Sequence, residues 1–200
     1  WGLALSLGPN INLPPDPERN AAAFRASRMA LSMTNGRTGP ERDLAEAISK
    51  RYTEKLPADK EGQHALDQAY ADAMRDLAKK YPADPDIQTL YAESLMDLRP
   101  WDLWTHDGKP QPGTEEIIAV LERVLAAHPD HPGANHYYIH AVEASPSPER
   151  GLAAAGRLPS LMPGAGHIVH MPSHIYVRTG RYEDAAEANR RAIHEDQTYL

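Results

Sequence analysis

Two pairs of histidines with the same spacing are the residues of this sequence best suited to do chemistry. His136 and His140 form the first pair, His170 and His174 form the second, and each member of the second pair follows its counterpart by 34 residues. Residues four apart on a helix have Cβ atoms roughly 5–6 Å apart, so a helical pair of this kind can ligate one metal ion. The fixed period therefore predicts a metal or ligand site built on repeated helices.

The available ligand types decide which metals such a site favours. The chain has no cysteine, so ligands must come from histidine, carboxylate or backbone oxygen. A site rich in imidazole favours Zn, Cu, Ni or Fe and disfavours Mg and Ca, which prefer oxygen. The zincin mechanism is excluded, because neither His136 nor His170 is followed by the glutamate that would act as base. Whether the protein is an enzyme stays open.

Composition argues against two classes of partner. The 200 residues carry a formal net charge of −7 and no clustered stripe of Lys and Arg, which disfavours nucleic acid and anionic membranes. Mean hydropathy is −0.59, and no run of about eighteen apolar residues occurs, so we expect a soluble chain without a membrane span. The chain starts at Trp1 and stops at Leu200 just after a helical pattern. We therefore expect a fragment at both ends, with localisation unknown and the cytoplasm slightly favoured.

Apolar residues recur with a period near 3.6 along the chain, and alternating strand patterns are missing. We therefore predict an all-α protein. Proline, glycine and Asp-Pro breaks delimit a helix end at 1–8 and helices at about 16–33, 39–53, 63–81, 87–97, 114–127, 133–144, 148–158, 167–179 and 182–196.

The segment 99–113 interrupts this pattern. It holds Trp101 and Trp104 among several prolines and glycines, and it is too long for a simple connection between helices. We predict a lid or a groove-lining insertion. The breaks that begin at Tyr81 and His128 lie 47 residues apart, so one period of 34 residues plus this insertion explains both spacings.

The last third of the chain resembles the tetratricopeptide (TPR) family. Gly180-Arg181-Tyr182-Glu183-Asp184-Ala185, followed by Ala192, is similar to the turn and second helix of that repeat, whose period is about 34 residues. Tyr176 and Ser173 stand where the family has its Tyr and a small residue. The match is specific over 135–200, fair over 63–134 and weak before that. The His-rich segment also resembles a group of bacterial TPR proteins without assigned biochemistry, which adds no activity.

This resemblance implies an all-α, TPR-like right-handed solenoid of antiparallel helix hairpins, with about four to five helix pairs in a single domain over 1–200. The clearest repeat-related segments are 61–98, 114–147, 148–181 and 182–200, with 99–113 inserted.

In TPR proteins the first helix of each hairpin lines a concave groove, and the family's repeat positions place several of these side chains there. The metal-ligand candidates are His136, His140, His167, His170, His174 and Glu93. The further groove candidates for binding a ligand are Glu143, Arg178, Asp97, Tyr138, Trp101 and Trp104.

Pro172 departs from the family pattern, because it occupies a position where Leu is usual. If the helix begins only at Pro172, His170 leaves the shared face and the site shrinks to His136, His140 and His174.

The leading functional hypothesis is a TPR protein with a His-rich transition-metal or small-ligand site in its concave groove, covered by the insertion. The alternative is a metal-free scaffold that holds a protein or peptide partner in the same groove. A metalloenzyme acting on a small molecule is the third possibility.

Overall fold

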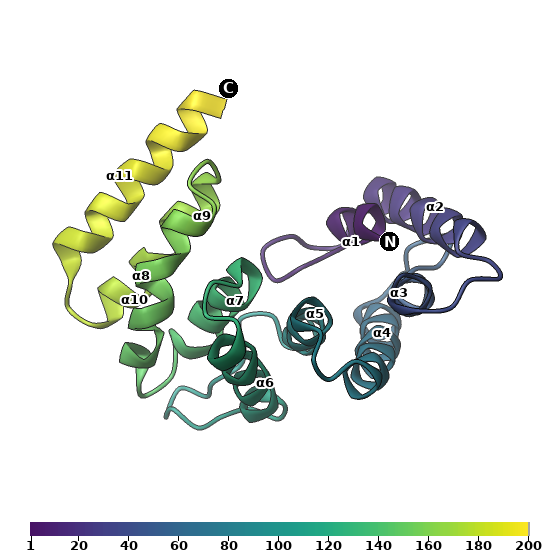
Figure 1. Ribbon diagram of the computed structural model, residues 1–200, viewed down its shortest axis with the longest axis horizontal. Helices are drawn as coiled ribbons and strands as arrows, with labels where there is room; N and C mark the ends of the chain where they lie inside the picture. Colours follow the sequence, from purple (N-terminus) through teal and green to yellow (C-terminus); the bar gives the residue numbers. More distant parts are fainter. Residues whose placement is uncertain (200) are drawn as a thin grey trace. The chain divides into compact units, whose positions relative to one another are not determined.

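The computed structural model describes residues 1–199, and all the regular elements among them are helices (Figure 1). Extended pairing within this range is limited to two isolated bridges, between Asn10 and Leu13 and between Trp104 and Pro110. None of the helices over 1–199 combines the length and the hydropathy that a membrane span needs. The all-α prediction is therefore confirmed.

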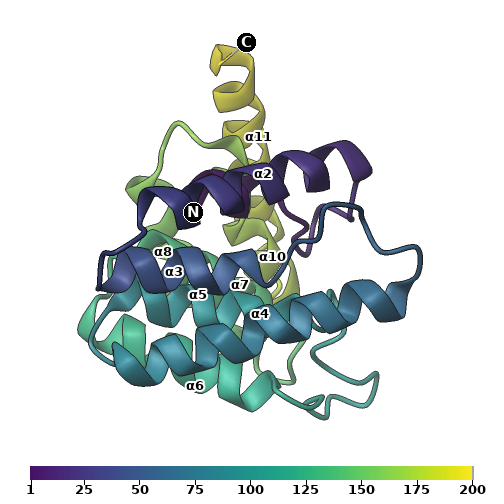
Figure 2. The same cartoon turned by 90° about the vertical axis from the view of Figure 1, so that its right-hand side faces the viewer.

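The chain forms two compact units, Trp1–Trp101 and Asp102–Leu200. In the first unit each helix packs against the next along the chain, and Figure 2 shows α2, α3 and α4 following one another in this way. Its helices are α1 Gly2–Leu7, α2 Pro17–Met33, α3 Pro40–Ser49, α4 Lys60–Lys80 and α5 Pro85–Met96.

Helix starts in the first unit follow from short sequence signals. The side chains of Asp16, Asp59 and Asp84 accept hydrogen bonds from backbone N–H groups at the starts of α2, α4 and α5. Those N–H groups have no partner within the helix, so each aspartate fixes where its helix begins. Proline at the first turn of α2, α3 and α5 adds a backbone angle that already suits a helix.

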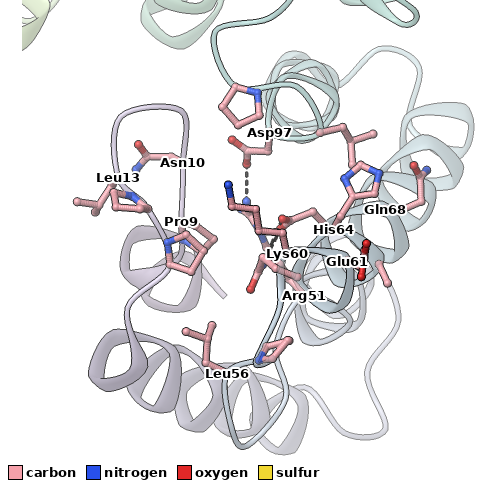
Figure 3. A pocket seen from close by; sticks show the side chains of 18 of the residues that line it. Pro9, Asn10, Leu13, Arg51, Leu56, Lys60, Glu61, His64, Gln68 and Asp97 are labelled. Atoms are coloured by element: carbon pink, nitrogen blue, oxygen red, sulfur yellow. Dashed lines mark hydrogen bonds and ion pairs between the residues drawn. The ribbon is translucent and has the colours of Figure 1, made fainter.

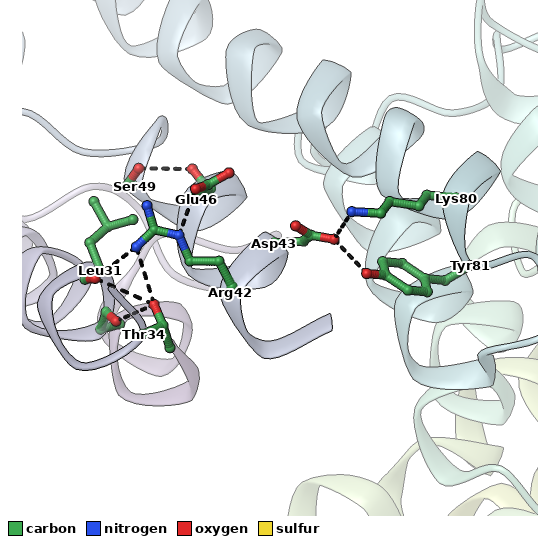
Figure 4. A network of polar contacts seen from close by, with 9 residues as sticks. Leu31, Thr34, Arg42, Asp43, Glu46, Ser49, Lys80 and Tyr81 are labelled. Atoms are coloured by element: carbon green, nitrogen blue, oxygen red, sulfur yellow. Dashed lines mark hydrogen bonds and ion pairs between the residues drawn. The ribbon is translucent and has the colours of Figure 1, made fainter. Parts of the chain in front are cut away.

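Polar contacts join α3 to its two neighbours (Figure 4). The carboxylate of Asp43 accepts hydrogen bonds from Lys80 Nζ and from the Tyr81 hydroxyl, both at 2.5 Å. On the other side of α3, Arg42 donates to the backbone oxygen of Leu31 at 2.8 Å. Because Lys80 is exposed, these contacts orient the helices more than they stabilise the fold.

The second unit also packs its successive helices side by side. α6 contacts α7, α7 contacts α8, and α8 contacts α10, while α11 runs along both α9 and α10 (Figure 1). Ile117, Leu121, Ile139, Leu158 and Ile175 fill its core. Its elements are α6 Thr114–Ala127, α7 Pro132–Val142, the 3₁₀ turn η1 Pro148–Gly151, α8 Leu152–Leu161, α9 Gly166–His170, α10 Pro172–Arg178 and α11 Tyr182–Tyr199.

The helix predicted at 167–179 is divided into α9 and α10, and this settles the question about Pro172. Pro172 is the first residue of α10, where the missing N–H of proline costs little. Met171, between the two helices, keeps helical backbone angles of φ −50° and ψ −38°. The backbone therefore continues in nearly the same course, and His170 stays beside His174. The expected alternative in which His170 leaves the face is wrong.

The insertion 99–113 is held by its tryptophans and by a tight turn. Trp104 donates its indole N–H to the backbone oxygen of Ala141 at the end of α7, at 2.8 Å. Trp101 belongs to the first unit, where its indole N–H lies 2.6 Å from the Ile11 oxygen. Gly108, with φ of 78°, packs so closely on Pro146 that a Cβ there would lie 2.8 Å from its ring. Both tryptophans thus anchor loop backbone, and the predicted role of the insertion as a cover stays a prediction.

Candidate metal centre

Five imidazole rings come together in the second unit. α7 contributes His136 and His140, α9 contributes His167 and His170, and α10 contributes His174. Neighbouring ring centroids lie between 4.8 and 6.4 Å apart. The 34-residue period of the two histidine pairs therefore corresponds to two helix faces that meet.

A glycine allows these helices to approach. A Cβ at Gly151, at the end of η1, would lie 2.6 Å from Ile175 of α10 and 3.1 Å from Val142 of α7. Real side chains do not tolerate such contacts, so any larger residue would push η1 away from both helices. The small size of Gly151 therefore helps to bring the histidine rings of α7 close to that of α10.

The carboxylate of Glu143 connects one histidine from each face. Its Oε1 lies 3.0 Å from Nδ1 of His140, and its Oε2 lies 2.7 Å from Nδ1 of His174. Burial alone would raise the pKa of Glu143, but these two hydrogen bonds outweigh it and lower the pKa to about 2. An ionised carboxylate can only accept, so both Nδ1 atoms donate. In the neutral rings of His140 and His174 the lone pair is then on Nε2.

His170 is oriented by a residue of α11. Its Nδ1 lies 2.5 Å from the amide oxygen of Asn189, and in this amide orientation the ring donates from Nδ1 and keeps its lone pair on Nε2. The Nε2 atoms of His170 and His174 are 3.0 Å apart. Two lone pairs facing each other at that distance would repel, so either a shared proton or a metal ion must lie between these nitrogens. Two imidazole ligands on a tetrahedral zinc, each at 2.0–2.1 Å, have nitrogens roughly 3.4 Å apart.

His136 and His167 form a second close pair, with their Nε2 atoms 3.0 Å apart. Burial, followed by the nearby rings of His140, His167 and His174, lowers the pKa of His136 to about 3. Burial and the neighbouring rings also lower the pKa of His167. Both rings are therefore neutral near pH 7, which is the form that binds a metal ion.

Two groups have the proximity that a metal site requires. The possible ligand atoms of His136, His140 and His167 lie within 4.8 Å of one another, and so do those of His140, Glu143 and His174. His140 belongs to both groups. Glu143 can therefore act either as a direct ligand in the second group or as the residue that fixes the His140 ring while Nε2 serves the first group.

Two of the predicted carboxylates, Glu93 and Asp97, belong to the first unit, whereas the histidine pairs belong to the second. Glu93 and Asp97 are buried near Arg51, and Arg51 Nη2 donates to Asp97 Oδ2 at 2.5 Å. Burial and then the neighbouring Asp97 raise the pKa of Glu93 well above its usual range. Neither ligand group contains Glu93. Its expected role as a metal ligand gains no support here, because its carboxyl group interacts with Asp97 and Arg51.

The remaining groove candidates of the second unit have other surroundings. Tyr138 is buried and its hydroxyl donates to Glu122 of α6 at 2.6 Å, so it faces the neighbouring helix. Arg178 is exposed at the end of α10. The indole N–H of Trp104 donates to the backbone oxygen of Ala141. Among these further groove candidates, Glu143 is hydrogen-bonded to two of the histidines, His140 and His174.

Two residues with structural importance for these sites were not anticipated. Asn189 is half-buried beside Ala188 in a helix that is rich in polar residues, so no local signal sets it apart. Arg51 follows the end of α3, and nothing local marks it as buried.

Comparison with known proteins supports the fold. The sequence matches no model of a protein family and no curated protein. Among solved structures, the chain is similar to the crystal structure of MamA, a TPR-like magnetosome protein, with a TM-score of 0.58 and 11% identity over 91% of each chain. At that identity the likeness concerns the fold alone. The chain thus has an all-α, TPR-like helical-repeat fold, and the resemblance seen in the sequence is confirmed to that extent.

Proposed function

We propose that this TPR-like protein binds a transition-metal ion through the histidine cluster of its second unit. The observation that carries the proposal is the contact between Nε2 of His170 and Nε2 of His174 at 3.0 Å. With the amide oxygen of Asn189 and the carboxylate of Glu143 as acceptors, both rings carry their protons on Nδ1. A metal ion placed against these nitrogens would replace repulsion between lone pairs by two coordinate bonds.

The chemistry of the cluster narrows the choice of ion. Five imidazoles and one carboxylate form a donor set that suits Zn, Cu, Ni or Fe and suits Mg or Ca poorly. The hydrogen bonds from Nδ1 to Glu143 resemble the carboxylate contacts that orient metal-bound histidines and raise their basicity. The low pKa of His136, about 3, also means that protons compete weakly for that ring.

Metal analysis of the chain, purified without a histidine tag, tests the proposal. We expect close to one equivalent of a transition metal, either as isolated or after titration with Zn²⁺ or Co²⁺ followed by desalting. The double variant His140→Ala with His174→Ala should lose this metal. The matched control is His106→Ala with His128→Ala, which removes two exposed histidines outside the cluster. Less than about a tenth of an equivalent in the parent chain, with no uptake on titration, would refute the proposal.

A metal-free interaction scaffold is the second candidate, favoured by apolar side chains that the last helices expose. Val177, Tyr182 and Ile193 are 51%, 68% and 57% exposed, and exposed apolar surface on a helical repeat is a common place for a protein partner. Thermal unfolding with and without a chelator separates the two candidates. A scaffold keeps its Tm in chelator, whereas a metal protein loses the stabilisation that binding provides. A metalloenzyme remains the third proposal and would need a substrate at the same ion.

A further inference from the structure

The histidine cluster of the second unit contains two separate close contacts between imidazoles. Nε2 of His136, on α7, lies 3.0 Å from Nε2 of His167, on α9. Nε2 of His170, also on α9, lies 3.0 Å from Nε2 of His174, on α10. We name these contacts the α7–α9 pair and the α9–α10 pair. A proton or a metal ion can occupy the same place between two such nitrogens, so each pair is a position where an ion can replace a proton.

The two pairs are different places in the cluster. The rings of His167 and His170, which connect one pair to the other along α9, have centroids 6.3 Å apart, against 5.0 and 4.8 Å within the pairs. The two groups of ligand atoms described above share His140 and no other residue. Nitrogens bound to one zinc ion lie at most roughly 4.2 Å apart, which is twice the bond length. One ion therefore cannot serve both groups unless the rings move.

His140 can support either pair, but only one at a time. Its ring centroid is 5.0 Å from that of His136 and 5.4 Å from that of His174. Its Nδ1 lies 3.0 Å from the carboxylate of Glu143, so the neutral ring presents Nε2 as its one metal-binding atom. With an ion at each pair, one ion has three imidazole ligands and the other has two. The two ions should therefore bind with different affinities.

We propose that the cluster binds two transition-metal ions, one at each pair, with His140 as the ligand for which they compete. This inference rests on the proposed function, which by itself needs only one ion. The ion with two imidazoles is held more weakly and is lost on desalting, which leaves one equivalent. His167 is exposed, so an ion at the α7–α9 pair can reach solvent and keep a coordination position for water or a small ligand.

The first unit offers a competing location for a second ion. His64 is the one histidine among residues 1–101, and it lines a cavity of about 1140 Å³ together with Glu61, which precedes it on α4 (Figure 3). Asp67 and Asp97 also line this cavity, but both are paired with Arg51. One imidazole and one carboxylate form a poorer donor set for these metals than two imidazoles with a third in reach. His64 is exposed like His167, so His64→Ala is a matched control.

Equilibrium dialysis against buffered free Zn²⁺, with the chain purified without a histidine tag, tests the inference. We expect the parent chain to bind close to two equivalents at saturation and to keep close to one after desalting. His167→Ala and His174→Ala each disrupt one pair, so each variant should bind one equivalent. That ion then has His140 to itself and should survive desalting. His64→Ala should bind two equivalents, as the parent chain does.

The possible failures are distinguishable. A parent chain that binds no zinc would refute the proposed function together with this inference. Saturation of the parent chain at one equivalent would overturn the second ion alone. Loss of an equivalent in His64→Ala, with two still bound by His167→Ala, would assign the second ion to the first unit and also overturn the inference. Circular dichroism checks the fold of each variant, and truncation of the exposed His167 should leave the fold intact.

Discussion

The two units each bury a set of polar side chains, but they satisfy those groups in different ways. In the first unit the guanidinium of Arg51 lies between Asp67 and Asp97 and forms an ion pair with each carboxylate. In the second unit the rings of His170 and His174 bring nitrogen atoms of the same kind face to face at 3.0 Å. The first set joins opposite charges by direct ion pairs, whereas the second joins like nitrogens that need a shared proton or a metal ion between them.

This difference separates a stabilising role from a binding role. Removing either partner of a buried ion pair destabilises the fold, because the remaining charge is buried without a counter-charge. Burying neutral imidazoles has a small desolvation cost, and their lone pairs remain available to an incoming ion. We therefore expect the first unit to depend on its network for folding and the second to depend on its cluster mainly for ligand affinity.

Arg51→Met should have the largest effect and sharpens the comparison on the side of the first unit. The change leaves Asp67 and Asp97 buried without their cation, and breaking a buried ion pair in this way costs about 3–5 kcal/mol. Urea unfolding followed by circular dichroism measures the loss. Lys79→Met is the control, because Lys79 pairs with Asp76 on the surface with 70% of its side chain exposed and should barely change the midpoint. Equal midpoints for the two variants would contradict a stabilising role for Arg51.

Glu143→Gln should have a smaller effect on folding and a clear effect on metal binding. The amide keeps the size of the side chain but no longer offers two acceptor oxygens to His140 and His174. Loss of such a supporting carboxylate lowers metal affinity by about 10–100-fold. Competition with a chromophoric chelator measures the dissociation constant for Zn²⁺. Glu149→Gln, at an exposed position of η1, serves as the control. If both variants bind the metal as the parent does, Glu143 neither binds the ion nor orients its ligands.

The same contrast explains what could be predicted from the sequence. The histidine pairs were visible because an i, i+4 spacing and a 34-residue period are local signals, and adjacent repeats bring such positions together. The helix bounds followed from equally local signals such as Asp16 and Asp84 at helix starts. Asn189 could not be found this way, because its role depends on how α11 packs on α9.

The Arg51 network was missed for the opposite reason. Its partners Asp67 and Asp97 are 16 and 46 residues away, at distances that correspond to no repeat or helix period. Glu93 was expected as a metal ligand and Asp97 as a groove residue, because the repeat register assigned both to the groove. Their burial beside an arginine depends on packing between α3, α4 and α5, which no single segment of the sequence specifies.

The dependence of stability on pH should have opposite signs in the two clusters. The pKa of His136 is lowered to about 3 by burial and by the neighbouring rings, so between pH 6.5 and 3 the unfolded chain binds a proton that the folded chain does not. Folding is therefore weakened as the pH falls, by about 2 kcal/mol between pH 6.5 and 5. The raised pKa of Glu93 acts in reverse, since its burial near Asp97 keeps a proton that the unfolded chain releases above its usual pKa. That contribution is present at low pH and is lost as the pH rises.

Chemical unfolding in the presence of a chelator, at pH 5, 6 and 7, gives the slope of the unfolding free energy against pH. The difference in slope between each variant and the parent chain measures each contribution. His136→Asn should remove the weakening at low pH, and Glu93→Gln should remove the weakening at high pH. Glu143, with a pKa of about 2, changes its proton binding below its ordinary value of 4.5 and does not affect this window. His106→Asn is the control, because His106 is exposed outside the cluster. If the slope of His136→Asn equals that of the parent chain, the ring is not held neutral by its surroundings. The histidines of the second unit would then contribute to the pH dependence of stability no more than exposed histidines do.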